Sequence, residues 1–192
     1  MKPKRVALAS WAVVVLAAAA VAQKPPENPT VDLNGGLQAQ IISVGVNPKL
    51  PSLTMSIKIS NKGKSTAFLL LYGEPSMIDD AGGKFDIRTV TGVAYCPGLT
   101  GVPLCVGIPR ADSNNTFSPR GYTQIDPDRS ITATFWAIGE SNITGTNLIF
   151  SENIGYRLVN DPAKDADLSD AEKLKQVQLG TLSFPPVAIN QK

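Results

Sequence analysis

The chain has 192 residues with 18 basic and 16 acidic side chains, and it contains no histidine. The missing imidazole excludes histidine-based catalytic triads and histidine metal ligands. A formal charge of +2 provides no strongly basic field for nucleic acid. The length is sufficient for one domain with a substantial hydrophobic core.

The N-terminus has the three parts of a cleavable secretory signal peptide. Residues 1–5 carry three positive charges, residues 6–22 are uncharged, and the segment closes on Ala20-Val21-Ala22. We expect residues 1–22 to be removed so that the mature chain begins at Gln23, and an uncleaved N-terminal anchor is the alternative. Cleavage leaves 15 basic and 16 acidic residues, a net charge near −1. No membrane insertion is expected after that cleavage.

The remaining chain is predicted to be a single β-rich domain. Residues 23–36 begin with a polar, proline-rich stretch and are expected to form an extended leader before a domain at 37–192. Strict alternation at 53–60 predicts a strand with one buried face, and 66–72 predicts a central strand. Other strands are predicted at 37–46, 77–78, 85–90, 130–136, 147–159 and 177–184, the last ended by Pro185-Pro186.

One short helix is predicted near residues 169–176, where Ser169 and Glu172 have the spacing of a capping box. Seven or eight short strands with a single helix favour an all-β, two-sheet sandwich. The apolar positions of the strands predict a core that includes Met55, Ile57, Ile59, Leu70, Phe135, Phe150 and Tyr156.

Three features in succession resemble bacterial extracytoplasmic immunoglobulin-like domains. They are the alternating strand that ends in Asn61-Lys62-Gly63, the hairpin at 79–83, and Ile125-Asp126-Pro127 before the strand at 130–136. The resemblance implies an immunoglobulin-like sandwich of 7–8 strands outside the cytoplasm. It departs from antibody domains because both cysteines lie in one loop.

Those cysteines are Cys96 and Cys105, joined by a segment rich in glycine and proline. An even pair in one loop of an exported protein predicts an intramolecular disulfide bond. Closing so short a loop contributes about 2.5 kcal/mol in the chain-entropy model. Two free thiols are the alternative, and the spacing differs from the C-x-x-C pattern of redox enzymes.

Residues 92–128 form a long segment with little strand pattern but with many apolar and aromatic residues. Loops of this length are usually functional or disordered, and the apolar and aromatic content of this one differs from that of a disordered linker. Tyrosine and arginine are typical anchors of interfaces. One hypothesis is therefore a partner-binding surface on this segment, and the alternative is a lid that covers an open end of the sandwich. The candidate binding residues are Tyr95, Arg110, Phe117, Arg120 and Tyr122.

Acidic residues suggest two further sites. Asp165, Asp167 and Asp170 imitate the start of a calcium loop, but the later glycine and glutamate of that loop are missing. A solvated helix N-terminus also accounts for them. Carboxylates for glycoside hydrolysis, which nothing in the sequence orients as a pair, would come from Asp79, Asp80, Asp126, Asp128, Glu140 or Glu152.

Together these patterns favour a non-catalytic protein-binding or assembly module of the bacterial cell envelope, periplasmic or secreted. Such a module needs no cofactor, and its partners would be envelope proteins of unknown identity. The alternatives are a calcium-dependent carbohydrate binder, a carboxylate-based hydrolase, and a pilin-like subunit whose leader donates a strand.

Overall fold

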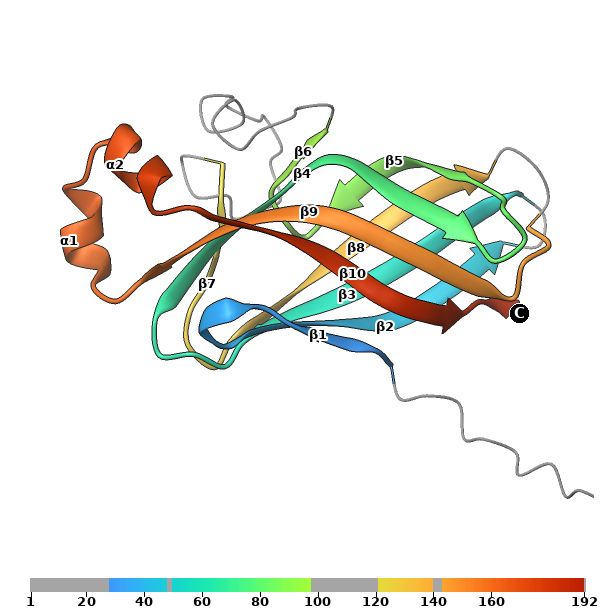
Figure 1. Cartoon of the computed structure of the whole chain (residues 1–192), viewed down its shortest axis with the longest axis horizontal. Helices are drawn as coiled ribbons and strands as arrows, with labels where there is room; N and C mark the ends of the chain where they lie inside the picture. The colour runs from blue at the N-terminus through green and yellow to red at the C-terminus, as the bar shows by residue number, and fades with distance from the viewer. Residues whose placement is uncertain (1–27, 48–49, 98–120, 140–142, 192) are drawn as a thin grey trace, which may run out of the picture.

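The computed structural model describes residues 28–47, 50–97, 121–139 and 143–191, and in it two β-sheets face each other across one core (Figure 1). The first sheet has the order β1-β2-β3-β8-β5, and β11 pairs in parallel with β2. Its strands are β1 (Thr30–Asp32), β2 (Leu37–Asn47), β3 (Ser52–Asn61), β8 (Ser130–Gly139), β5 (Phe85–Thr91) and β11 (Asn190–Gln191).

The second sheet has the order β10-β9-β4-β6, and β7 pairs with another stretch of β4. Its strands are β10 (Gln178–Ala188), β9 (Asn147–Val159), β4 (Thr66–Asp79), β6 (Tyr95–Pro97) and β7 (Thr123–Ile125). The order β2-β3-β8-β5 opposite β10-β9-β4 is that of the ABED and CFG sheets of an immunoglobulin-like domain. The predicted all-β, immunoglobulin-like two-sheet sandwich is therefore confirmed.

The described residues contain eleven strands, more than the seven or eight predicted. The additional ones, β1, β6, β7 and β11, are two or three residues long, too short to show a period of two in the sequence. β1 and the 3-10 helix η1 (Asn34–Gly36) lie within the predicted leader, and β1 pairs with β2 at the edge of the first sheet.

The apolar side chains at alternate positions of β3 form the centre of the core. Met55 and Ile57 are fully buried, and their partners on β8 are Phe135 and Ala133. The predicted core is confirmed, with one refinement: Leu70 is buried in a second cluster, apart from the main core. Since Leu69 and Leu71 belong to the main core, Leu70 lies on the opposite face of β4, outside the sandwich.

Two strand ends differ from the prediction. β4 continues through residues 77–78 as one strand, because a bulge between Tyr72 and Ser76 absorbs the irregular residues. β10 does not end at Pro185-Pro186 but runs to Ala188, with a register shift between Phe184 and Val187. Proline is tolerated there because β10 is an edge strand and its missing N–H groups can face away from β9.

The predicted helix is α2 (Asp170–Lys175), and its capping box is confirmed: Ser169 Oγ accepts from Glu172 N, and Glu172 Oε2 accepts from Ser169 N. A second helix, α1 (Pro162–Ala166), was not predicted; Asp161 caps it. Leu174 of α2 packs on the outer cluster around Leu70. With at most six residues each, these described helices fall far short of a bilayer's thickness, and no described helix could cross one.

Candidate functional site

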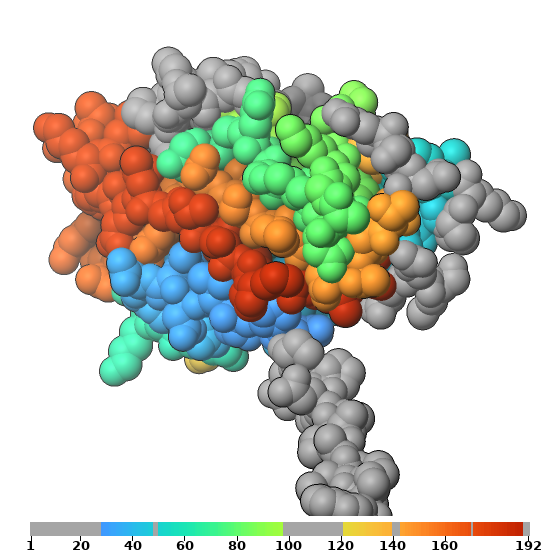
Figure 2. All heavy atoms as spheres, turned by 45° about the vertical axis from the view of Figure 1, so that its right-hand side comes forward, coloured from blue at the N-terminus to red at the C-terminus, as the bar shows by residue number. Residues whose placement is uncertain are grey.

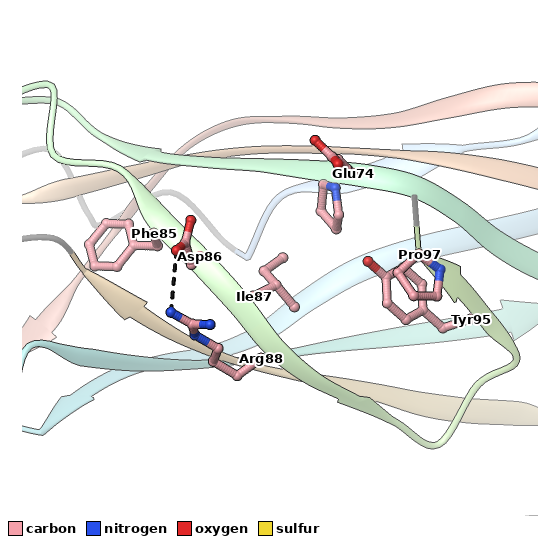
Figure 3. Close-up of a pocket in the computed structure, with 8 residues that line it drawn as sticks. Glu74, Phe85, Asp86, Ile87, Arg88, Tyr95 and Pro97 are labelled. Carbon is pink, nitrogen blue, oxygen red and sulfur yellow. Dashed lines mark hydrogen bonds and ion pairs between the residues drawn. The ribbon is translucent and has the colours of Figure 1, made fainter. Parts of the chain in front are cut away.

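A cleft of about 440 Å³ lies at one edge of the sandwich, between β5 of the first sheet and β4 and β6 of the second. Figure 3 shows the side chains that line it, which combine aromatic, aliphatic and charged groups. Its size is within the range of known ligand sites. The lining residues are Glu74, Pro75, Phe85, Asp86, Ile87, Arg88, Tyr95 and Pro97.

The wall from the second sheet is formed where β4 bulges. Gly73 has a φ of +93°, a backbone conformation that glycine adopts without strain, and Glu74-Pro75 follow it within the register shift. β6 pairs in parallel with β4 at this level, which places Tyr95 beside the bulge. The Tyr95 hydroxyl donates to the Gly73 carbonyl over 3.3 Å. The ring is therefore held in place at the cleft rather than free to turn away.

The opposite wall is β5, which among the described strands pairs only with β8 and so ends the first sheet. A register shift between Ile87 and Thr89 kinks this strand. Asp86 and Arg88 form an ion pair of 3.4 Å, with side chains 66% and 53% exposed, which adds little to stability. Bulges and charges on an edge strand oppose the addition of another strand. This edge is consequently better suited to side-chain contacts than to sheet extension.

Of the predicted partner-binding residues, Tyr95 lines the cleft. Tyr122 is only 5% exposed and belongs to the outer cluster of the second sheet. Its buried hydroxyl has no hydrogen-bond partner among the described residues, and burial raises the pKa of its phenol. The other three, Arg110, Phe117 and Arg120, lie outside the described residues.

Sequence reasoning missed the partners of Tyr95 on β4 and β5. Two signals could have indicated them: the Glu74-Pro75 interruption within a long apolar strand, and the charged pair Asp86 and Arg88 on an otherwise β-prone segment. Neither signal says that the two segments face each other, since they belong to different sheets.

Cys96 lies on β6, is 8% exposed and is not a free thiol. Its expected partner, Cys105, is outside the described residues. The Cys96–Cys105 bond therefore stays a prediction, and its position immediately after Tyr95 would brace the cleft.

Among the aspartates of the calcium hypothesis, Asp165 is engaged by a cationic side chain of the protein. Arg157 donates to both carboxylate oxygens of Asp165, and the guanidinium lies 4.7 Å from the centre of the Phe68 ring. Asp167 is exposed at the end of α1, and Asp170 begins α2. Within the described parts of the chain, no group of three acidic or cysteine side chains is arranged to hold a metal ion.

Most of the carboxylates considered for hydrolysis have structural contacts. Asp79 accepts from the backbone N–H groups of Ala81, Gly83 and Gly145. Asp80 accepts four hydrogen bonds from Thr146 and Asn147, which hold the pKa of its carboxyl far below the usual range.

The remaining members of that set are scattered. Asp126 accepts from Thr66 and Gln124, and Asp128 occupies a turn with a φ of +59°. Glu152 is buried, which raises its pKa to about 8. Glu140 lies outside the described residues. None of the described carboxylates in this set lines the cleft.

No family model matches this chain, and no curated protein matches it. Two solved structures are similar in part. One is an ASH/PapD-like domain of human CEP192, with 11% identity over 98% of both chains and a TM-score of 0.30. The other is titled "AvmM Catalyzes Macrocyclization in Alchivemycin A Biosynthesis", with 12% identity over 83% of this chain and 92% of that chain and a TM-score of 0.31. TM-scores this low do not support a fold assignment, so the assignment of the immunoglobulin-like fold rests on the strand order of the two sheets.

Proposed function

We propose that this domain is a non-catalytic interaction module of the bacterial cell envelope, which holds a segment of a partner protein in the cleft between β5 and β6. The observation that carries the proposal is the set of side chains in that cleft: Tyr95 and Ile87 offer apolar contact, and Arg88 offers a charged group beside them. Tyrosine and arginine are enriched among residues that dominate binding energy.

The shape of the cleft supports a side-chain mode of recognition. Ile87 lies between Asp86 and Tyr95 in Figure 3, so an apolar side chain of the partner would pack against Ile87 and the Tyr95 ring. The exposed Asp86–Arg88 pair and Glu74 at the rim would set the charge pattern of the flanking residues. Rim charges act mainly on the rate and selectivity of association.

The N-terminal sequence pattern, which predicts export, supports the envelope as the proposed location. The uncharged run at 6–22 and the Ala20-Val21-Ala22 end are the features that signal peptidase requires. N-terminal sequencing of the protein recovered from outside the cytoplasm should give Gln23 as the first residue. Recovery of Met1 or Lys2 would instead indicate a retained anchor.

Site-directed photocrosslinking in intact cells tests the proposed cleft. A benzophenone side chain at Ile87 should crosslink to one partner, and the same group at Leu179 should not. Leu179 is the matched control because it is apolar, 64% exposed and on β10, which pairs with β9 on the side away from β4 and β6.

The crosslink from position 87 should weaken by about tenfold in a Tyr95→Ala background, the loss expected from removing an anchor worth about 1.4 kcal/mol. Tyr95→Phe should keep most of it, since the ring remains. Equal crosslinking from positions 87 and 179, or no effect of Tyr95→Ala, would refute the cleft as the binding site.

A further inference from the structure

The outward face of the first sheet carries a second surface, which adjoins the cleft along β5, because Thr89 directly follows the cleft residue Arg88. Strands β2, β3 and β8 together contain one charged residue, Lys58. The outward positions of these strands include Gln38, Gln40, the exposed Ile42 and the half-buried Ile138, together with seven hydroxyl side chains that are exposed or half-buried. The hydroxyl side chains are those of Ser43, Thr54, Ser56, Ser60, Ser130, Thr132 and Thr134.

Trp136 lies toward one end of this hydroxyl face, in the row of Thr54, and is 39% exposed. Its cross-strand partners are Thr54 on β3 and Thr89 on β5, so a threonine flanks the indole on each side. In the next row, Ser56 Oγ and Thr134 Oγ1 lie 3.3 Å apart. Gly45 on β2 pairs with Thr54, and the space that a side chain at Gly45 would fill is open. No side chain therefore projects above the sheet next to Thr54 on this side.

The chemistry of this face restricts what can bind it. A large exposed aromatic ring favours an apolar contact, and surrounding hydroxyls both donate and accept hydrogen bonds. Lys58 is the one charged residue of β2, β3 and β8, and Asp86 and Arg88 on the adjoining β5 pair with each other, so the face offers little net attraction to an anionic polymer. Ile42 and Ile138 are also apolar and at least partly exposed on this face, but Ser43, Ser56 and Thr54 lie between Ile42 and Trp136, so no continuous apolar patch of the kind that a protein partner needs is formed.

A pyranose ring matches these features, since its C–H face is apolar and flat while its edge carries hydroxyl groups. We infer that the hydroxyl face around Trp136 binds a neutral polysaccharide of β-linked hexoses, with one sugar ring stacked on the indole and its hydroxyls bonded to Thr54 and Thr89. This inference does not depend on the cleft or on a metal ion.

Affinity electrophoresis of the full chain tests the inference. Hydroxyethylcellulose or a soluble mixed-linkage β-glucan in a native gel should retard the wild-type protein, and dextran sulfate should not. Trp136→Ala should weaken the retardation by about tenfold, the effect of losing one stacking contact of about 1.4 kcal/mol. Leu179→Ala, at an exposed apolar residue of the other sheet, should leave it unchanged.

Fluorescence provides a direct second readout. Trp11 and Trp136 are the two tryptophans, so in a Trp11→Phe chain the emission comes from Trp136 alone. Cellohexaose should shift that emission to shorter wavelength, and thermal melting should show that Trp136→Ala still folds.

The inference fails if neither glucan retards the wild type, or if Trp136→Ala is retarded equally. It also fails if sedimentation shows that Trp136→Ala merely dissociates a dimer formed through this face. A cleft variant, Tyr95→Ala, should bind the glucans normally, so failure of the proposed cleft and failure of the glycan face can be told apart.

Discussion

Glu152 is a carboxyl group inside the core, and its replacement should change how stability depends on pH. The residue lies on β9 opposite Leu182 of β10 and is 2% exposed. Its Oε1 accepts from the Asn153 N–H over 2.8 Å, and no atom of the described part of the chain forms a hydrogen bond with its Oε2. Burial of this group raises its pKa from 4.5 to about 8, because the charged form loses its hydration.

The sign of the effect follows from proton binding. At a pH between 4.5 and about 8, the folded chain retains the proton on Glu152 and the unfolded chain has released it. The free energy of unfolding therefore falls as pH rises through this interval and becomes constant above it. The difference between the two pKa values corresponds to a loss of about 5 kcal/mol, as an upper limit.

Urea unfolding followed by tryptophan fluorescence measures this loss. The wild type should lose several kcal/mol between about pH 5 and about pH 9, and Glu152→Gln should lose much less because it cannot ionise. Glu152→Met, which places an apolar chain of similar length among core residues, should be more stable than the wild type at the upper pH. Glu74→Gln is the control, since Glu74 is exposed on the cleft rim. Identical pH slopes for wild type and Glu152→Gln would refute the reasoning.

Three further substitutions probe other buried contacts by the same assay. Arg157→Ala should cost about 3–5 kcal/mol, because it leaves the buried carboxylate of Asp165 without its partner; a cost below that of an exposed ion pair would contradict this account. Asn61→Ala should lower the free energy of unfolding by about 3 kcal/mol, because the Asn61 side chain accepts one hydrogen bond from the Gly63 N–H and donates two to backbone carbonyls. Unchanged stability would show that water replaces these bonds. Gly92→Ala should lower the free energy of unfolding by more than about 1 kcal/mol, because φ is +79° and a Cβ would lie 2.0 Å from the Thr132 carbonyl oxygen. Unchanged stability would mean that the backbone at Gly92 moves to accommodate the methyl group.

The sequence alone determined the fold class and the strands that alternate. Leu53, Met55 and Ile57 project to one side of β3 whatever the partner strand is, because the side-chain period of a strand is two. The capping box at Ser169 was equally local, since its hydrogen bonds join residues three apart. The N-terminal signal-peptide pattern is also local, but it lies outside the described residues and stays a prediction.

The tertiary structure decided which distant residues meet. Tyr95 is separated from Ile87 by a turn and lies on the other sheet, and only closure of the sandwich brings both to one cleft. Asp165 appeared in the sequence as one of several solvated acids, yet docking of α1 places it on Arg157 of β9. Trp136 acquired flanking threonines from two neighbouring strands because strand register, which no single segment encodes, sets cross-strand pairs.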